Sequence, residues 1–133
     1  MKNITREMIH VYNIKKVGCD FAGYTFKSVN SLSFHHLIIP AREGGKEIIQ
    51  NGAVLNGLTS HPYLHLIEFK DPEIFYRITS EMIDENIKGK IDIDNLKHIR
   101  DLLLYFEKEH EDDTTKKGKK LIKWEYKNER IKL

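Results

Sequence analysis

The sequence predicts an α+β fold in which a small β-hairpin is followed by several helices. Two observations favour strands in the first half of the chain. Aromatic and β-branched residues gather in residues 21–26 and 32–39, and an apolar run over residues 46–55 follows a glycine pair. A third observation favours helices in the second half, because apolar residues recur at i, i+3 and i+4 in residues 74–83 and again in residues 96–106.

The composition is typical of one charged globular domain spanning residues 1–133. Charged residues make up 32% of the chain, compared with about 25% in ordinary globular proteins. The single cysteine, Cys19, excludes an internal disulfide and a zinc site built from paired cysteines. No apolar stretch approaches the ~20 residues that span a bilayer, and the first residues lack the apolar middle of a secretory signal. We therefore expect a cytoplasmic protein with no membrane partner.

The predicted hairpin occupies the first half of the chain. Residues 5–16 are compatible with a short helix or a short strand, and residues 21–26 and 32–39 are predicted to be strands, the second ending at Pro40. Residues 41–45 are predicted to form a flexible loop, because its two glycines lack a Cβ and can take positive φ. The following apolar run returns beside the second strand as a β-hairpin.

Three helices are expected after the hairpin. Thr59 or Ser60 can cap the first helix. The Asp-Pro pair at residues 71–72 marks the start of the second helix. The aspartates in residues 92–94 suit a cap of the third helix better than a second metal site. Residues 72–110 are thus predicted to be helical support for the hairpin.

Four of the seven histidines lie within a window of 31 residues that also contains Asn51. The four are His35 and His36 on the first arm of the hairpin, and then His61 and His65. Histidine can accept a proton near neutral pH and is the commonest metal ligand. Two histidines at i and i+4 lie on one helix face, so both imidazoles can reach one ion. The window therefore favours a metal site that also carries a base.

This order of elements resembles the HNH nuclease family, whose fold is the ββα-metal fold. Residues 32–68 carry the resemblance: a strand with paired histidines, a loop, an asparagine, a return strand, and a helix with an H-x3-H pair. The resemblance implies that His35, His61 and His65 bind one divalent ion. It also implies that His36 is the general base that activates water.

The resemblance gives Asn51 a structural task in the catalytic hairpin. Its side-chain amide is expected to bond across the backbone of the loop and to hold the base in register. Asparagine before glycine is also a common turn residue. Asn56, which precedes Gly57, is the alternative candidate for the same task.

The chain departs from the family pattern in two respects. His35 stands where an acidic ligand is usual, so the ion could be Mg, Mn, Zn, Ni or Co, and imidazoles suit Mg least. The paired cysteines that brace many HNH domains are absent. Packing by apolar and aromatic residues must supply that bracing, and we expect it from Tyr63, Leu66, Ile67 and Phe69.

Basic residues outside the histidine motif are candidates for DNA contacts. Arg42 or Lys46 could meet a phosphate beside the glycine pair, or could be solvated loop charges. Residues 114–133 carry seven lysines and one arginine against two glutamates, which suits an arm that contacts phosphates or a solvated tail. The lysines expected to bind DNA there are Lys116, Lys117, Lys119 and Lys120. The remaining histidines, His10, His98 and His110, are predicted to be surface residues.

Together these features favour a small HNH endonuclease, of phage or prophage type, that hydrolyses DNA phosphodiester bonds with one divalent ion. Its partner would be DNA, with a homodimer or a larger nucleoprotein partner also possible. The alternative is a non-catalytic nucleic-acid-binding or assembly protein that keeps the HNH scaffold and binds a structural metal in a closed four-ligand site. A third interpretation is a metal-dependent hydrolase that acts on another substrate. A positively charged groove beside the ion would argue against this interpretation.

Overall fold

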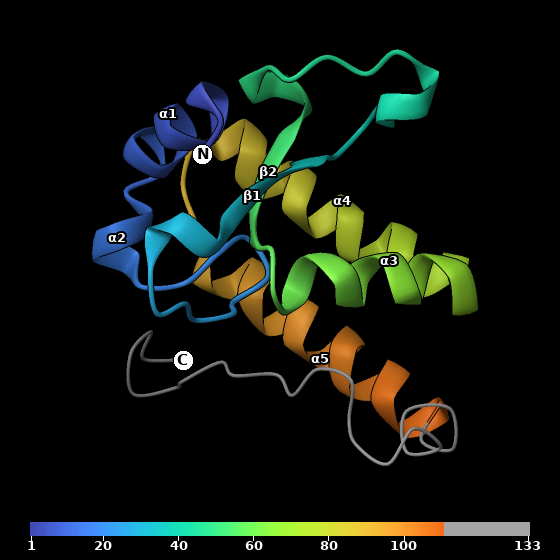
Figure 1. The fold of residues 1–133 in the computed structure, drawn as a ribbon. Helices are drawn as coiled ribbons and strands as arrows, with labels where there is room; N and C mark the ends of the chain where they lie inside the picture. The colour runs from blue at the N-terminus through green and yellow to red at the C-terminus, as the bar shows by residue number, and fades with distance from the viewer. Residues whose placement is uncertain (111–133) are drawn as a thin grey trace.

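The computed structural model describes residues 1–110 as a mixed fold of helices and one two-stranded antiparallel sheet (Figure 1). Two short helices come first and three longer helices follow the sheet. In chain order the elements are α1 (Asn3–Val11), α2 (Ile14–Val17), β1 (Leu32–His36), β2 (Gly52–Asn56), α3 (Ser60–Lys70), α4 (Pro72–Lys88) and α5 (Ile93–Glu109). The α+β class predicted from the sequence is therefore confirmed.

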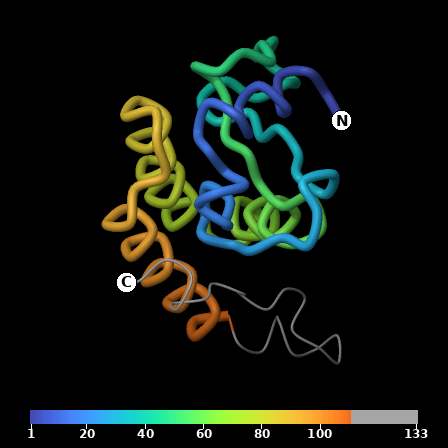
Figure 2. The backbone as a smooth tube through the Cα atoms, turned by 90° about the vertical axis from the view of Figure 1, so that its left-hand side faces the viewer, coloured from blue at the N-terminus to red at the C-terminus, as the bar shows by residue number. Residues whose placement is uncertain are grey.

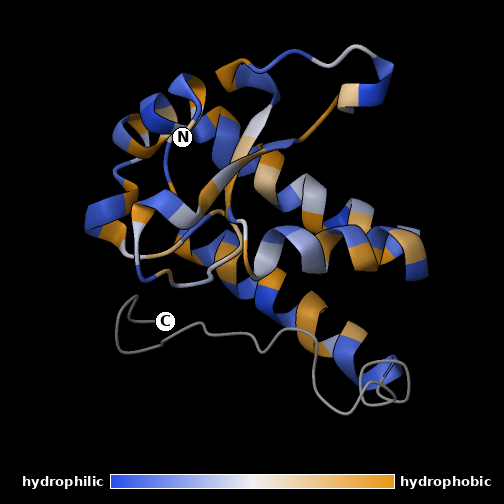
Figure 3. Ribbon diagram, in the orientation of Figure 1, coloured by the Kyte–Doolittle hydropathy of each residue, from blue (hydrophilic) through white to orange (hydrophobic). Residues whose placement is uncertain are grey.

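The sheet is a hairpin with a long loop between its strands. β1 and β2 pair in the register Leu32↔Asn56 to His36↔Gly52. Helix α1 contacts both strands, whereas α3 and α4 contact β2. Every residue of β2 is buried as a result, and Figure 3 shows apolar residues recurring along α4 and α5. In Figure 2, α4 lies above α5 on the left of the hairpin and α1, and the two helices contact each other.

Local capping signals set the ends of the two long helices. The Asp71 side chain accepts a hydrogen bond from the Ile74 backbone N–H at 3.3 Å, directly before Pro72 begins α4. Gly89 ends α4 in the left-handed region, with φ +73°. Asp92 caps α5 by accepting from the Asp94 N–H at 2.9 Å. These helix starts were predicted correctly because each depends on residues adjacent in the sequence.

The predicted strand at residues 21–26 is wrong. The Asp20 carboxylate accepts hydrogen bonds from the Ala22 and Tyr24 backbone N–H groups, both at 2.9 Å, and Gly23 takes φ +89°. These side-chain bonds fold the segment into turns and satisfy donors that a sheet ladder would otherwise need. Phe21 and Tyr24 still join the core, since both are almost fully buried.

Other element boundaries also differ from the sequence prediction. β1 ends at His36, three residues before the predicted end of its strand, and β2 begins only at Gly52. Residues 49–51 form a 3-10 turn, whereas the sequence favoured strand up to residue 49 and a turn at residues 51–52. The N-terminal segment, left open between helix and strand, is helical in α1 and α2.

Two side chains lie in surroundings that the sequence analysis did not predict. Phe69 was expected to brace α3, but it is 79% exposed, whereas Tyr63 and Ile67 are buried as expected. His110 was expected on the surface, but it is half-buried and stacks on Phe106 with ring centroids 4.4 Å apart. His10 and His98 are exposed, as predicted.

No helix within residues 1–110 combines the length and the apolar character that crossing a bilayer requires. The predicted basic arm, including Lys116, Lys117, Lys119 and Lys120, lies outside the described residues.

Candidate metal centre

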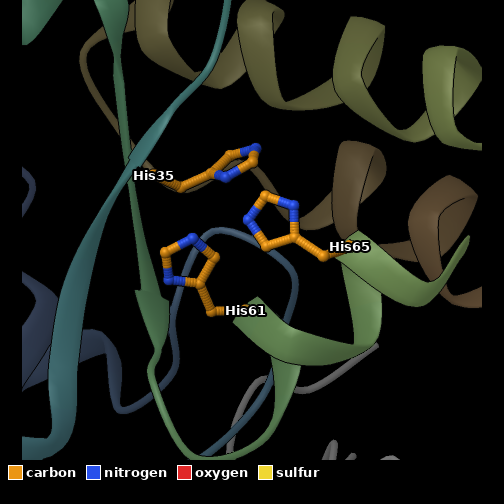
Figure 4. Close-up of side chains that lie close together, drawn as sticks. All are labelled: His35, His61 and His65. Atoms are coloured by element: carbon orange, nitrogen blue, oxygen red, sulfur yellow. The ribbon is translucent and has the colours of Figure 1, made fainter. Parts of the chain in front are cut away.

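Three histidines from two different elements converge on one point. His35 comes from β1, and His61 and His65 come from successive turns of α3 (Figure 4). Their ring centroids lie 5.1 Å apart for His35 and His61, 5.5 Å for His35 and His65, and 5.0 Å for His61 and His65. One ligand atom from each residue can be chosen so that all three lie within 4.8 Å of one another. β2 makes this possible because it pairs with β1 and leads through a short turn into α3.

His35 carries the clearest sign of a missing partner. It is only 3% exposed, and its Nε2 atom is buried without a hydrogen-bond partner among the described residues. Burial, followed by the neighbouring histidines, lowers its pKa from 6.5 to about 3. The imidazole is therefore neutral near pH 7, and a neutral ring nitrogen with a free lone pair is what a metal ion requires. An unsatisfied buried nitrogen is costly unless a ligand completes it.

Ser33 fixes the tautomer of His61. The Ser33 hydroxyl donates to the Leu55 carbonyl at 3.2 Å and lies 2.7 Å from His61 Nδ1. Because a hydroxyl has one proton and a carbonyl can only accept, the Ser33 oxygen accepts from Nδ1–H. The His61 Nε2 lone pair is then left for a ligand. Burial and the nearby histidines lower the His61 pKa to about 4, which keeps this ring neutral too.

Glu68 provides an acceptor for Nδ1 of His65, as Ser33 does for His61. Its Oε1 atom lies 3.3 Å from His65 Nδ1, one turn further along α3. An acceptor at Nδ1 orients the ring and leaves Nε2 toward the other two imidazoles. Outer contacts of this kind commonly orient metal-binding histidines.

These donors fit a divalent transition-metal ion. Zn–N bonds of about 2.0–2.1 Å put two nitrogens on one ion no more than about 4 Å apart. Ligand atoms within 4.8 Å of one another need only a small inward movement to reach that geometry. Three imidazole ligands favour Zn²⁺, Ni²⁺, Co²⁺ or Mn²⁺ over Mg²⁺.

The three histidines open onto a cleft of about 630 Å³, which we call the histidine cleft. Its walls come from β1, the loop at residues 37–43, α3 and α4. His36 lines the same cleft although it follows His35 directly in the strand. β1 ends at His36, so adjacent residues are not held to opposite faces beyond that point. The half-buried His36 ring packs edge-on against Phe34, with centroids 5.0 Å apart.

Asn51 braces the loop that forms one wall of the cleft. Its Oδ1 accepts from the Ile38 and Ile39 N–H groups at 2.9 and 2.8 Å, and its Nδ2 donates to the Ile39 and Lys46 carbonyls at 2.9 and 3.1 Å. Gly45 lets the far side of the loop pack closely, because a Cβ there would lie 1.8 Å from the Ile39 carbonyl oxygen. The amide therefore bonds across the loop backbone, as the sequence analysis expected of it.

Asn56 lies at the opposite end of β2 from the loop. Its side chain donates to the Thr25 carbonyl at 3.0 Å and accepts from the Leu58 N–H at 2.9 Å. These bonds secure the turn that leads into α3. Of the two asparagines considered, only Asn51 contacts the hairpin loop.

The two basic loop residues occupy different places. Arg42 lines the histidine cleft, beside Glu43. Lys46 is exposed, and within the described part of the chain it is not among the residues that line the cleft.

Comparison with known proteins identifies no relative. No protein-family model, curated protein or solved structure matches the chain.

Sequence reasoning missed Ser33 and Glu68, which contact His61 and His65, and Tyr76 of α4, which lines the histidine cleft. Two signals were available, since alternate strand residues share a face, as Ser33 and His35 do, and helix residues three apart are neighbours, as His65 and Glu68 are. Nothing in the sequence placed α4, and hence Tyr76, against the cleft.

Proposed function

We propose that this protein is a metal-dependent endonuclease of the HNH type that hydrolyses DNA phosphodiester bonds. The convergence of three imidazoles, one with an unpartnered buried nitrogen, carries the proposal. The order of a hairpin, with His35 and His36 on its first strand, and a helix with His61 and His65 supports a ββα-metal core.

Three residues, His36, Asn51 and Arg42, have separate roles in the proposed hydrolysis. His36 takes a proton from a water molecule as the water oxygen bonds to phosphorus. The bond from phosphorus to the 3′-oxygen breaks, and that oxygen leaves with a proton from solvent, which gives 5′-phosphate and 3′-hydroxyl ends. A bound divalent ion would supply charge stabilisation at the phosphate. Asn51 holds the loop next to His36, and Arg42 pairs with a phosphate oxygen.

The openness of the site favours catalysis over a structural ion. The three histidines provide three ligands and face a cleft, whereas structural zinc sites are closed by four protein ligands. The non-catalytic alternative requires a fourth protein ligand, for which Glu68 is the nearest acidic group on α3.

A plasmid-nicking assay with Mg²⁺, Mn²⁺, Zn²⁺, Ni²⁺ or Co²⁺ tests the function. We expect nicking with at least one transition metal, none in EDTA, and none from His65→Ala. His98→Ala is the matched control, because His98 is an exposed histidine whose Nδ1 also lies 3.3 Å from a glutamate oxygen, that of Glu81. Tight metal binding without cleavage of any DNA would instead support the structural-ion alternative.

A further inference from the structure

The charges that line the histidine cleft do not suit a DNA duplex. Arg42 is the only lysine or arginine among the described residues that line it, and Glu43 and Glu68 line it too. A duplex carries a phosphate charge for every ~1.7 Å of its length and is usually bound through several lysines and arginines. One arginine suits one or two phosphates instead.

The rest of the cleft wall is aromatic and apolar. Tyr76 on α4 is 66% exposed although it lines the cleft. Its ring lies 5.8 Å from that of Phe75, which in turn lies 6.5 Å from the His35 ring. An exposed aromatic face is thus held close to the proposed metal site.

Ile38 presents a second apolar surface from the loop. Its side chain is 56% exposed and lines the same cleft. Its backbone N–H is held by Asn51, so the exposed side chain stands on a braced segment. An apolar side chain fixed in this way beside a cleft suits contact with a flat, apolar ligand surface.

We propose that the substrate of this site is an unpaired DNA strand, with the scissile phosphate beside Arg42 and the three histidines and a neighbouring base stacked on Tyr76 next to Ile38. This inference rests on the proposed nuclease function. In a duplex the base faces are covered by their neighbours, whereas an unpaired strand exposes them. Stacking on an aromatic ring tolerates any sequence, since every base has a π-face.

The test measures binding separately from cleavage. Fluorescence anisotropy in EDTA compares labelled oligothymidine with the same strand in a duplex. We expect the single strand to bind more tightly, and Tyr76→Ala to weaken its binding about 5- to 150-fold, as the loss of one base stack does. Tyr76→Phe keeps the ring and should bind as the unchanged protein does.

Tyr105→Ala provides the matched control, because Tyr105 on α5 is 55% exposed and lies outside the histidine cleft. The inference is overturned if Tyr76→Ala weakens binding no more than Tyr105→Ala, or if the duplex binds as tightly as the single strand. Incubation of the labelled oligothymidine and of its duplex with the metals of the nicking assay reports on cleavage separately from binding. Cleavage confined to duplex DNA would refute the strand preference and leave the nuclease function standing. Tyr76-dependent binding without cleavage by any metal would refute the nuclease function alone.

Discussion

Two clusters of polar side chains, each with a buried residue at its centre, lie beside the hairpin, and they differ in how completely the polar atoms of that residue are partnered. Asp20 is fully buried, and its two carboxylate oxygens accept from the Ala22, Tyr24 and Asn56 N–H groups and from the Ser60 hydroxyl. His35 is buried almost as deeply, yet its Nε2 atom has no partner among the described residues. A cluster that satisfies itself is expected to stabilise the fold, whereas an incomplete one indicates where a ligand belongs.

The Asp20 cluster and the histidine cluster are connected through β2 and α3. Through Asn56 and Ser60, Asp20 joins the end of β2 to the first residue of α3. α3 then carries His61 and His65 toward His35. The complete cluster therefore positions the incomplete one, and the two should respond differently to mutation.

The largest expected effect is the loss of cleavage in His36→Ala. General-base removal typically lowers rates by about 10²–10⁴-fold. Metal affinity should stay near that of the unchanged protein, because the three proposed ligands remain. Calorimetric titration with Zn²⁺ and the nicking assay measure the two quantities. If His36→Ala lost metal affinity as completely as His65→Ala does, His36 would be a ligand and not the base.

The pH dependence of stability should have opposite signs in the two clusters. The folded-state pKa of His35 is about 3, below the value of 6.5 for the free side chain. The unfolded chain therefore binds the extra proton first, and the free energy of unfolding should fall as pH drops from 6.5 toward 3, by at most about 5 kcal/mol. His61, with a pKa of about 4, acts in the same direction.

Asp20 opposes this trend. Burial raises its folded-state pKa from 3.8 to about 6 despite its hydrogen bonds. Its contribution to stability is complete below pH 3.8 and is lost as pH rises through 6, by about 3 kcal/mol at most. Urea unfolding of the metal-free protein between about pH 4 and pH 7 measures both terms. His35→Leu should flatten the loss of stability in acid, and Asp20→Asn should steepen it. If the free energy of unfolding of Asp20→Asn changed less with pH than that of the unchanged protein, the sign assigned to the Asp20 contribution would be wrong.

Asp20→Ala should be the most destabilising single change within the self-satisfied cluster. It leaves the Ala22, Tyr24 and Asn56 N–H groups without their acceptor. We therefore expect the free energy of unfolding to fall by about 3 kcal/mol or more. Asp20→Asn keeps one oxygen for Ala22 and Tyr24 but turns an NH₂ group toward the Asn56 N–H, so its effect should be intermediate. Equal stability of the two variants in urea unfolding would show that the bonds to Ala22 and Tyr24, which Asp20→Asn keeps and Asp20→Ala loses, contribute little.

The comparison also explains what the sequence could and could not predict. The starts of α4 and α5 follow from Asp71 and Asp92, whose capping bonds reach only two or three residues along the chain. The convergence of His35 with His61 and His65 was expected from the resemblance to the HNH family, which rests on the order of strand, loop, strand and helix. That order limits where α3 can begin.

The failures come from both long-range and local contacts. Asp20 contacts Asn56 and Ser60 across 36 and 40 residues, and no local pattern indicates such a bond. One failure has a local cause, because bonds from the Ala22 and Tyr24 N–H groups to the same aspartate turn residues 21–26 away from the strand that their aromatic composition favours. Phe69 resembles a core residue by type, but its helix buries the faces that carry Tyr63 and Ile67 instead.

The smallest effect we predict tests whether the incomplete cluster has supports of its own. Ser33→Ala removes the acceptor at His61 Nδ1, and the ring is then free to rotate or to change tautomer. Loss of such an outer contact typically weakens metal binding about 10- to 100-fold. Ser33→Thr keeps the hydroxyl on a strand residue and should restore the affinity. Ser31→Ala is the control, because within the described residues the Ser31 hydroxyl bonds only to the nearby Ser28 carbonyl, at 2.7 Å. Calorimetry with Zn²⁺ reports the affinity, and urea unfolding of the metal-free protein reports stability. A fall in affinity without a matching fall in stability would assign Ser33 to the metal site, whereas equal losses in Ser33→Ala and Ser31→Ala would reduce it to an ordinary strand residue.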